Sequence, residues 1–181
     1  TINSGSGATL QIRLNGGSYS ATASGSASST LALNVGANTV DVLVTAQDGV
    51  TTKTYTITAT KAAPSAVATL SALTTTAGTL TPSFATGTKT YAASVVGTTA
   101  SVTVTPTVTQ ANATIQARVN GGSYVAVTSG SASSALSLNV GVNPIEVLIT
   151  AQDGTTTDLY TINVTRAAAP IWENTLTGTS L

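Results

Sequence analysis

Hydrophobic and polar residues alternate along several short stretches of the chain, and a period of two indicates β-strands. Residues 39–45 (TVDVLVT) and 52–58 (TKTYTIT) are two such stretches, and they flank the turn residues Asp48 and Gly49. The dipeptide Asp-Gly is typical of tight hairpins, because it supplies the backbone positions with positive φ that they need. We therefore predict a β-hairpin over residues 38–61.

A second hairpin is predicted near the start of the chain. Residues 9–14 and 18–22 have strand character, and the dipeptide Asn15-Gly16 between them favours a tight turn. A run of small polar residues then indicates a loop that leads into a further short strand. This loop and this strand cover residues 24–29 and 31–33.

The chain contains a long internal repeat. Residues 9–61 return as residues 114–166 without insertion or deletion, at an offset of 105 positions (114 minus 9). This offset has the length of one β-sandwich domain and exceeds the roughly 20–50 residues of solenoid repeats, so each copy should fold as a globular unit. Four further strands are predicted directly ahead of the second copy, and the first copy has no counterpart of them in this sequence. They are residues 69–73, 78–84, 89–95 and 100–108.

Alanine and proline residues after the last strand of each copy mark the domain boundaries, because proline interrupts sheet pairing. Residues 1–61 are interpreted as the back half of a β-sandwich that lacks its N-terminal strands. Residues 62–167 are interpreted as a complete β-sandwich. Residues 168–181 form a tail that either begins a further element or supplies a donated strand.

Composition agrees with this organisation. The chain has 38 threonines among 181 residues, and β-branched side chains favour strands. Turn residues recur about every 8–12 positions and no helical period is present, which is typical of immunoglobulin-like folds. The predicted fold class is all-β, with tandem immunoglobulin-like antiparallel β-sandwiches of Greek-key topology.

Charge and residue types exclude several classes of function. The formal net charge is zero, which argues against nucleic acid, and there is no run of about 20 apolar residues for membrane insertion. The absence of histidine and cysteine removes the common catalytic bases, thiol nucleophiles and zinc ligands, so we expect no enzyme, no metal and no cofactor. Asp48 and Asp153 recur in the repeat, but their position before glycine is interpreted as turn capping.

Several motifs together resemble the bacterial cadherin-like β-sandwich domain family. The resemblance spans one full domain over residues 66–166 and the back half of another over residues 1–61. It implies an immunoglobulin-like sandwich that occurs in tandem in large secreted or surface proteins of bacteria, with no common catalytic residues and no calcium site in this linker. The motifs lie in residues 79–84 (TLTPSF), 89–91 (KTY), 101–106 (SVTVTP), 143–149 (NPIEVLI), 151–155 (AQDGT) and 160–162 (YTI).

Five side chains are candidates for contact with a partner. Tyr19 and Tyr124 follow the two Asn-Gly-Gly turns and could stack on a sugar, although a tyrosine beside a hairpin turn more often packs across the strand pair. Trp172 lies in the tail with Ile171 and Leu176, and such apolar residues indicate that something buries the tail. It either starts a further domain or forms an inter-subunit strand.

Two functions remain open from the sequence. The first is a non-enzymatic structural or adhesive module of an extracellular or cell-surface protein, whose partners are copies of itself or neighbouring domains. In this case the incomplete first copy could accept a strand and assemble head-to-tail into a filament. The alternative is a carbohydrate-binding accessory module of a larger secreted protein. Charged residues make up 7% of the chain, and this low share favours an extracellular location.

Overall fold

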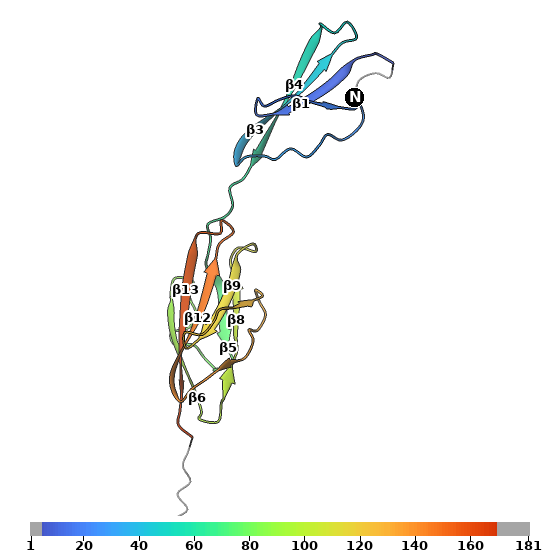
Figure 1. The fold of residues 1–181 in the computed structure, drawn as a ribbon. Helices are drawn as coiled ribbons and strands as arrows, with labels where there is room; N and C mark the ends of the chain where they lie inside the picture. The colour runs from blue at the N-terminus through green and yellow to red at the C-terminus, as the bar shows by residue number, and fades with distance from the viewer. Residues whose placement is uncertain (1–4, 170–181) are drawn as a thin grey trace, which may run out of the picture. The chain divides into compact units, whose positions relative to one another are not determined.

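The computed structural model describes residues 5–169 of the 181-residue chain. The chain divides into two compact units, Thr1–Ala63 and Pro64–Leu181, which are called the first and the second unit (Figure 1). All regular elements in the described part are β-strands, which confirms the predicted all-β fold class.

The first unit is a single antiparallel sheet. Its strands follow the order β2-β1-β3-β4, with β4 at one edge. The hairpin of β3 and β4 keeps one register over its whole length, from Gly36 opposite Lys61 to Thr45 opposite Thr52. The strands are β1 (Thr9–Leu14), β2 (Ser20–Thr22), β3 (Gly36–Thr45) and β4 (Thr52–Lys61).

The second unit contains the same sheet with one additional strand. The order is β10-β9-β12-β13-β6, and β6 joins the outer edge of β13 in parallel. Every other pairing in this sheet is antiparallel and lies at the position that the repeat requires. The strands are β6 (Thr90–Val95), β9 (Thr114–Val119), β10 (Val125–Val127), β12 (Gly141–Thr150) and β13 (Thr157–Arg166).

Two strand pairs complete the β-sandwich of the second unit. β5 (Leu70–Thr75) pairs with β8 (Val104–Val108), and β7 (Ser101–Val102) pairs with β11 (Leu136–Ser137). Inward-facing side chains of these strands and of the five-stranded sheet form one hydrophobic core, which includes Leu70, Val104, Ile145, Tyr160 and Ile162. Sheets that pack face to face bury alternate residues in this way.

We call residues 64–113 the front segment and residues 114–166 the second back segment. Residues 9–61, the other copy of the repeat, are the first back segment. The front segment carries β5 to β8 and therefore covers the sheet of the second unit. Among residues 5–63, no strands equivalent to β5 to β8 accompany the first back segment.

Local chemistry accounts for the shared turns. Asn15 and Gly16 have φ values of 50° and 73°, and Asn120 and Gly121 have values of 51° and 70°. Two consecutive residues with positive φ are what a tight hairpin turn requires, and asparagine and glycine adopt this conformation most easily. Strand pairing resumes only at Ser20, so the predicted strand over residues 18–22 is wrong in its first two positions.

A buried asparagine fixes the loop before each long hairpin. Asn143 is completely buried, and its Nδ2 donates to the carbonyl oxygens of Asn139 at 2.8 Å and Gly141 at 2.9 Å. Its Oδ1 accepts from the backbone N–H of Asn139 at 2.7 Å. Asn38 makes the corresponding bonds in the first unit. A fully bonded buried amide specifies one loop conformation.

Three predicted strands differ from the structure. Residues 78–84 form no strand and contain only an isolated bridge between Thr81 and Ala92. Residues 100–108 divide into β7 and β8 at Thr103, whose backbone N–H donates to Thr76 Oγ1 at 2.8 Å. This division lets β7 and β8 pair with different strands. Residues 31–33 form no strand, although their copy contains β11. The strand that pairs with β11 is β7 of the front segment, and the first unit has no equivalent of it among its described residues.

Candidate functional site

The outer edge of β4 is the main feature that distinguishes the first unit from the second. In the second unit the equivalent strand β13 pairs with β6, from Thr161 opposite Thr90 to Arg166 opposite Val95. β4 pairs with β3 alone among the strands of residues 5–169. An unpaired edge presents a row of backbone donors and acceptors to which another strand can add.

The inner face of the same strand is uncovered. Tyr55 and Ile57 in β4 have exposed fractions of 53% and 56%, whereas their equivalents Tyr160 and Ile162 have 0%. The side chains are identical in the two copies, so their different burial comes from the front segment. Among residues 5–63 the buried side chains are those of Asn38 and Val40.

Tyr160 shows what this face contacts when it is covered. Its hydroxyl group donates to the carbonyl oxygen of Thr86 at 3.0 Å and accepts from the backbone N–H of Leu70 at 3.2 Å. Its ring also lies against Phe84, with 6.5 Å between the ring centroids. All three partners belong to the front segment. Tyr55 carries the same groups on the uncovered face of β4.

The front segment also contacts a loop of the second back segment. The copy of this loop in the first unit contains residues 24–33. In the second unit, Ser133 N–H donates to Val104 O at 2.8 Å, and Ser133 Oγ accepts from Val104 N–H at 3.1 Å. Leu138 N–H donates to Ala100 O at 2.9 Å. The front segment therefore binds the second back segment at the edge of β13, on the sheet face and along this loop.

The first back segment retains the conformation of the second at its turns. Gly25, Gly36 and Gly49 have φ values of 79°, 94° and 71°, close to the 75°, 96° and 73° of their copies. These positions are Gly130, Gly141 and Gly154. An acceptor surface that is already formed loses little conformational freedom when a partner binds.

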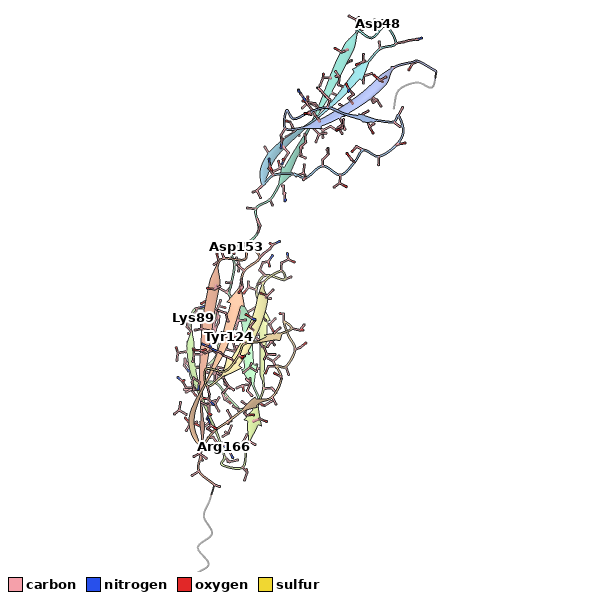
Figure 2. The ribbon with its side chains drawn as sticks, in the orientation of Figure 1. Asp48, Lys89, Tyr124, Asp153 and Arg166 are labelled. Carbon is pink, nitrogen blue, oxygen red and sulfur yellow. The ribbon has the colours of Figure 1, made fainter. Side chains whose placement is uncertain are left out.

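The edge strands β4 and β13 differ in charge at one position. Lys89 lies in the second unit, next to β6 (Figure 2). It forms an ion pair with Asp158 of β13, and its Nζ lies 3.9 Å from the ring centroid of Tyr160. Burial lowers the pKa of Lys89, but the hydrogen bonds and charges of Asp158 and Tyr160 outweigh this and raise it above its ordinary value. Lysine stands at the Asp158 position in the first unit. This is Lys53, whose Nζ lies 5.3 Å from the ring centroid of Tyr55.

The two tyrosines that the sequence proposes for ligand contact lie elsewhere. The guanidinium carbon of Arg13 lies 4.6 Å from the ring centroid of Tyr19, and that of Arg118 lies 4.3 Å from the ring centroid of Tyr124. Each arginine also forms an ion pair with an acid of the neighbouring strand, Arg13 with Asp41 at 2.9 Å. Arginine therefore occupies one face of each tyrosine ring.

The recurring aspartates cap turns. Asp153 Oδ1 accepts from the backbone N–H groups of Thr155 at 2.9 Å and Thr156 at 2.8 Å. A hydrogen bond from the Thr156 side chain, with these two backbone bonds, lowers the pKa of Asp153 to about 2. Asp48 makes the same contacts, and the hydrogen bonds from Thr51 and Val50 lower its pKa as well.

Three further observations concern the described residues. Residues 5–169 contain no group of three His, Cys, Asp or Glu side chains that could hold a metal ion. A hollow of about 260 Å³ lies beside β5 and is lined by Leu73, Leu80, Phe84 and small polar residues. Within the same residues there is no helix that is long and apolar enough to cross a lipid bilayer.

The proposed inter-subunit residues Ile171, Trp172 and Leu176 lie outside the described part of the chain.

Sequence reasoning did not select the residues of the β4 edge. Tyr55 and Ile57 resemble ordinary core residues, and their exposure depends on which strands cover them. One signal was present in the sequence. Each back segment has five charged residues, and four of these positions keep their sign between the copies. Position 53 is the fifth, because Lys53 corresponds to Asp158.

Solved structures match this chain at low sequence identity. One of them contains the Clostridium thermocellum CbhA fibronectin(III)-like modules. The match has 16% identity and a TM-score of 0.34, and it covers 92% of this chain and 83% of that chain. Another is the Bacteroides ovatus mixed-linkage glucan utilization locus protein SGBP-B in complex with a mixed-linkage heptasaccharide, with 10% identity and a TM-score of 0.24. That match covers 88% of this chain and 60% of the other. A search of curated proteins gives no significant match.

The sequence itself matches a described family in both units. The matched segments are residues 3–62 and 70–167, and together they cover most of the chain. This match confirms the resemblance that the sequence motifs indicate. The chain belongs to the cadherin-like beta sandwich domain family.

Proposed function

We propose that this chain is a non-enzymatic structural module of an extracellular bacterial protein, and that its first back segment is an acceptor for β-strands of a partner segment. The observation that carries the proposal is the exposure of Tyr55 and Ile57, at 53% and 56%, where identical residues of the second unit are fully buried. Strand addition to an exposed sheet edge is a common mode of recognition, since main-chain hydrogen bonds supply affinity and side-chain pockets supply specificity.

The energetic reason for an acceptor role is the apolar surface of the sheet. Complete burial of an aliphatic or aromatic side chain stabilises a protein by roughly 1.5–3 kcal/mol. Ile57 and Tyr55 do not gain this in the first unit, and Val42 and Val44 are covered only in part. A partner that covers them would gain that burial together with the hydrogen bonds at the edge of β4.

The surface chemistry supports an extracellular role. Only 7% of the residues are charged, so the surface is solvated largely by hydroxyl groups. When the partner segment belongs to another chain, strand addition joins molecules head-to-tail, and a contact of this kind that does not close gives a filament. Negative-stain electron microscopy of the concentrated chain tests this form of the proposal, because only monodisperse particles would rule it out.

The acceptor role is tested with the full chain and an added front segment. The added polypeptide is residues 64–113 with Lys89→Gln, which removes the charge that would face Lys53. We expect hydrogen–deuterium exchange in β4 to slow in proportion to the added polypeptide, while exchange in β13 stays constant because β6 already occupies that edge. Unchanged exchange in β4 at every concentration would sink the proposal.

Carbohydrate binding is the alternative, and it depends on Tyr19 and Tyr124. Each ring has one face that is not stacked on arginine, so a sugar could pack there. The test is affinity electrophoresis in gels that contain soluble glucans, with the double variant Tyr19→Ala/Tyr124→Ala as control. Retardation of the parent chain that disappears in the variant would favour this alternative over the structural role.

A further inference from the structure

The charges of the front segment and of the back segments form a simple pattern. Lys89 is the only charged residue among positions 64–113. In the folded second unit its ammonium group reaches Asp158, and this is the one charged position whose sign differs between the two back segments. The single charged residue of the front segment, Lys89, therefore contacts the single position at which the two back segments carry opposite charges.

The contact between Lys89 and Asp158 belongs to the junction of the two segments. The Lys89 carbonyl oxygen accepts from Thr161 N–H at 2.8 Å, and Lys89 Nζ donates to Thr86 O at 3.2 Å. The side chains of Lys89 and Asp158 are 37% and 24% exposed, so both charges are partly removed from water. Screening by water is weaker at such a site than at the surface.

The first back segment would place a lysine at the same point. Lys53 and Tyr55 stand in β4 where Asp158 and Tyr160 stand in β13, and the Lys53 ammonium group lies over the Tyr55 ring. A front segment with lysine at position 89 would bring two ammonium groups together on one aromatic ring. Like charges in direct contact across strands are destabilising, and opposite charges are stabilising.

We propose that the partner of the first back segment is a front segment of the cadherin-like type that carries an aspartate or glutamate at the position of Lys89. This inference rests on the acceptor role proposed above and names the chemistry of the partner. The acidic side chain would pair with Lys53 and reproduce, with reversed polarity, the ion pair of the second unit.

The same argument disfavours the front segment of a second copy of this chain as the donor, so it does not bear on a filament in which another strand of the chain is donated. The front segment of a second copy presents Lys89, which repels Lys53 and also loses Asp158. The remaining contact positions do not discriminate between the two acceptors in this way. Some are identical or conservative, such as Ile57 with Ile162 and Lys61 with Arg166, and others differ in size but not in charge, such as Ala59 with Val164. The charge at position 53 thus acts as the selective element, because specificity requires a repulsive contact with the wrong partner.

The experiment uses a chain in which a second front segment is joined directly ahead of Thr9. The natural junction between residues 113 and 114 has this geometry, so the repeat offset is kept. Four versions are compared. The added front segment carries either the natural Lys89 or Lys89→Glu, and the first back segment carries either the natural Lys53 or Lys53→Asp. The rate of hydrogen–deuterium exchange in β4 reports completion of the first unit, and exchange in β13 serves as an internal reference.

We expect the two versions with opposite charges to exchange in β4 about fivefold to tenfold more slowly than the two versions with like charges. The control is Ala92→Glu in the added segment that retains lysine. It places an acid on the same strand, but Ala92 is exposed on the opposite face, so exchange should match that of the lysine version.

Three outcomes are distinguishable. Slower exchange in both oppositely charged versions supports the charge rule. Equal protection of β4 in all four versions overturns the charge rule but leaves the acceptor role intact. Exchange in all four versions that is as fast as in the parent chain overturns the acceptor role and the charge rule together.

Discussion

Asn120 Nδ2 donates a hydrogen bond of 2.9 Å to Asn143 Oδ1, and Asn15 Nδ2 donates a bond of the same length to Asn38 Oδ1. The donor in each pair lies in the Asn-Gly turn, and the acceptor lies in the long strand of the neighbouring hairpin. One side-chain bond therefore connects two hairpins. It is retained in the first unit, although most of the sheet there is uncovered.

The buried asparagine should be essential for the stability of the second unit. In Asn143→Ala the backbone groups of Asn139 and Gly141 lose their partners, and leaving buried polar groups unsatisfied costs about 1–3 kcal/mol each. We expect the free energy of unfolding in urea to fall by about 3 kcal/mol. The exposed Asn112→Ala is the control and should change it by less than about 0.5 kcal/mol. Similar losses of unfolding free energy in both variants would contradict a stabilising role for the hydrogen bonds of Asn143.

The two equivalent tyrosine hydroxyls should differ in their effect on stability. Tyr160→Phe removes the bonds to Thr86 and Leu70, and each such bond contributes about 1 kcal/mol. The urea midpoint of the second unit should decrease accordingly. Tyr55→Phe should have almost no effect, because this side chain is more than half exposed. In the chain with an added front segment the Tyr55→Phe effect should approach that of Tyr160→Phe, and a persistent lack of effect would argue against an equivalent interface.

Reversal of the charge at position 158 should weaken the second unit. Asp158→Lys reproduces the residue of the first unit and places it against Lys89. The pair is partly exposed, so we expect a loss of about 1 kcal/mol in thermal unfolding experiments. The second substitution Lys89→Glu should restore most of this loss. Without restoration in the double variant, the effect of Asp158→Lys would have another origin.

The thermal stability of the chain should depend on pH through its turn aspartates. The folded pKa of Asp153 is about 2, below its ordinary value of 3.8, because the hydroxyl of Thr156 and two backbone N–H groups bind the charged form. A group with a lowered folded pKa contributes stability above its unfolded pKa and loses that contribution as the pH falls through the folded pKa. The melting temperature of the parent chain should therefore approach that of Asp153→Asn between about pH 4 and pH 2. A constant difference between the two over this range would contradict the assignment.

Sequence patterns predict the strands of the long hairpins well, because alternation, Asp-Gly and Asn-Gly act locally. They fail for residues 31–33, which have the same apolar pattern as their copy but no strand to pair with. The candidate site was hidden for the same reason. Ile57 has the residue type and spacing of a core position, and only the arrangement of the other strands determines whether it is buried.

The parallel pairing of β6 with β13 also has a mechanical consequence. β13 is the last strand among the described residues of the second unit, so a pull on the chain beyond Arg166 acts along the length of this strand. Its hydrogen bonds to β6 and β12 then carry the force in shear and must break together, which resists extension more than the sequential opening of a hairpin. β4 holds the corresponding place in the sheet of the first unit but has only one neighbour among the described residues. A strand added at its edge would therefore give the first unit the tensile strength of the second.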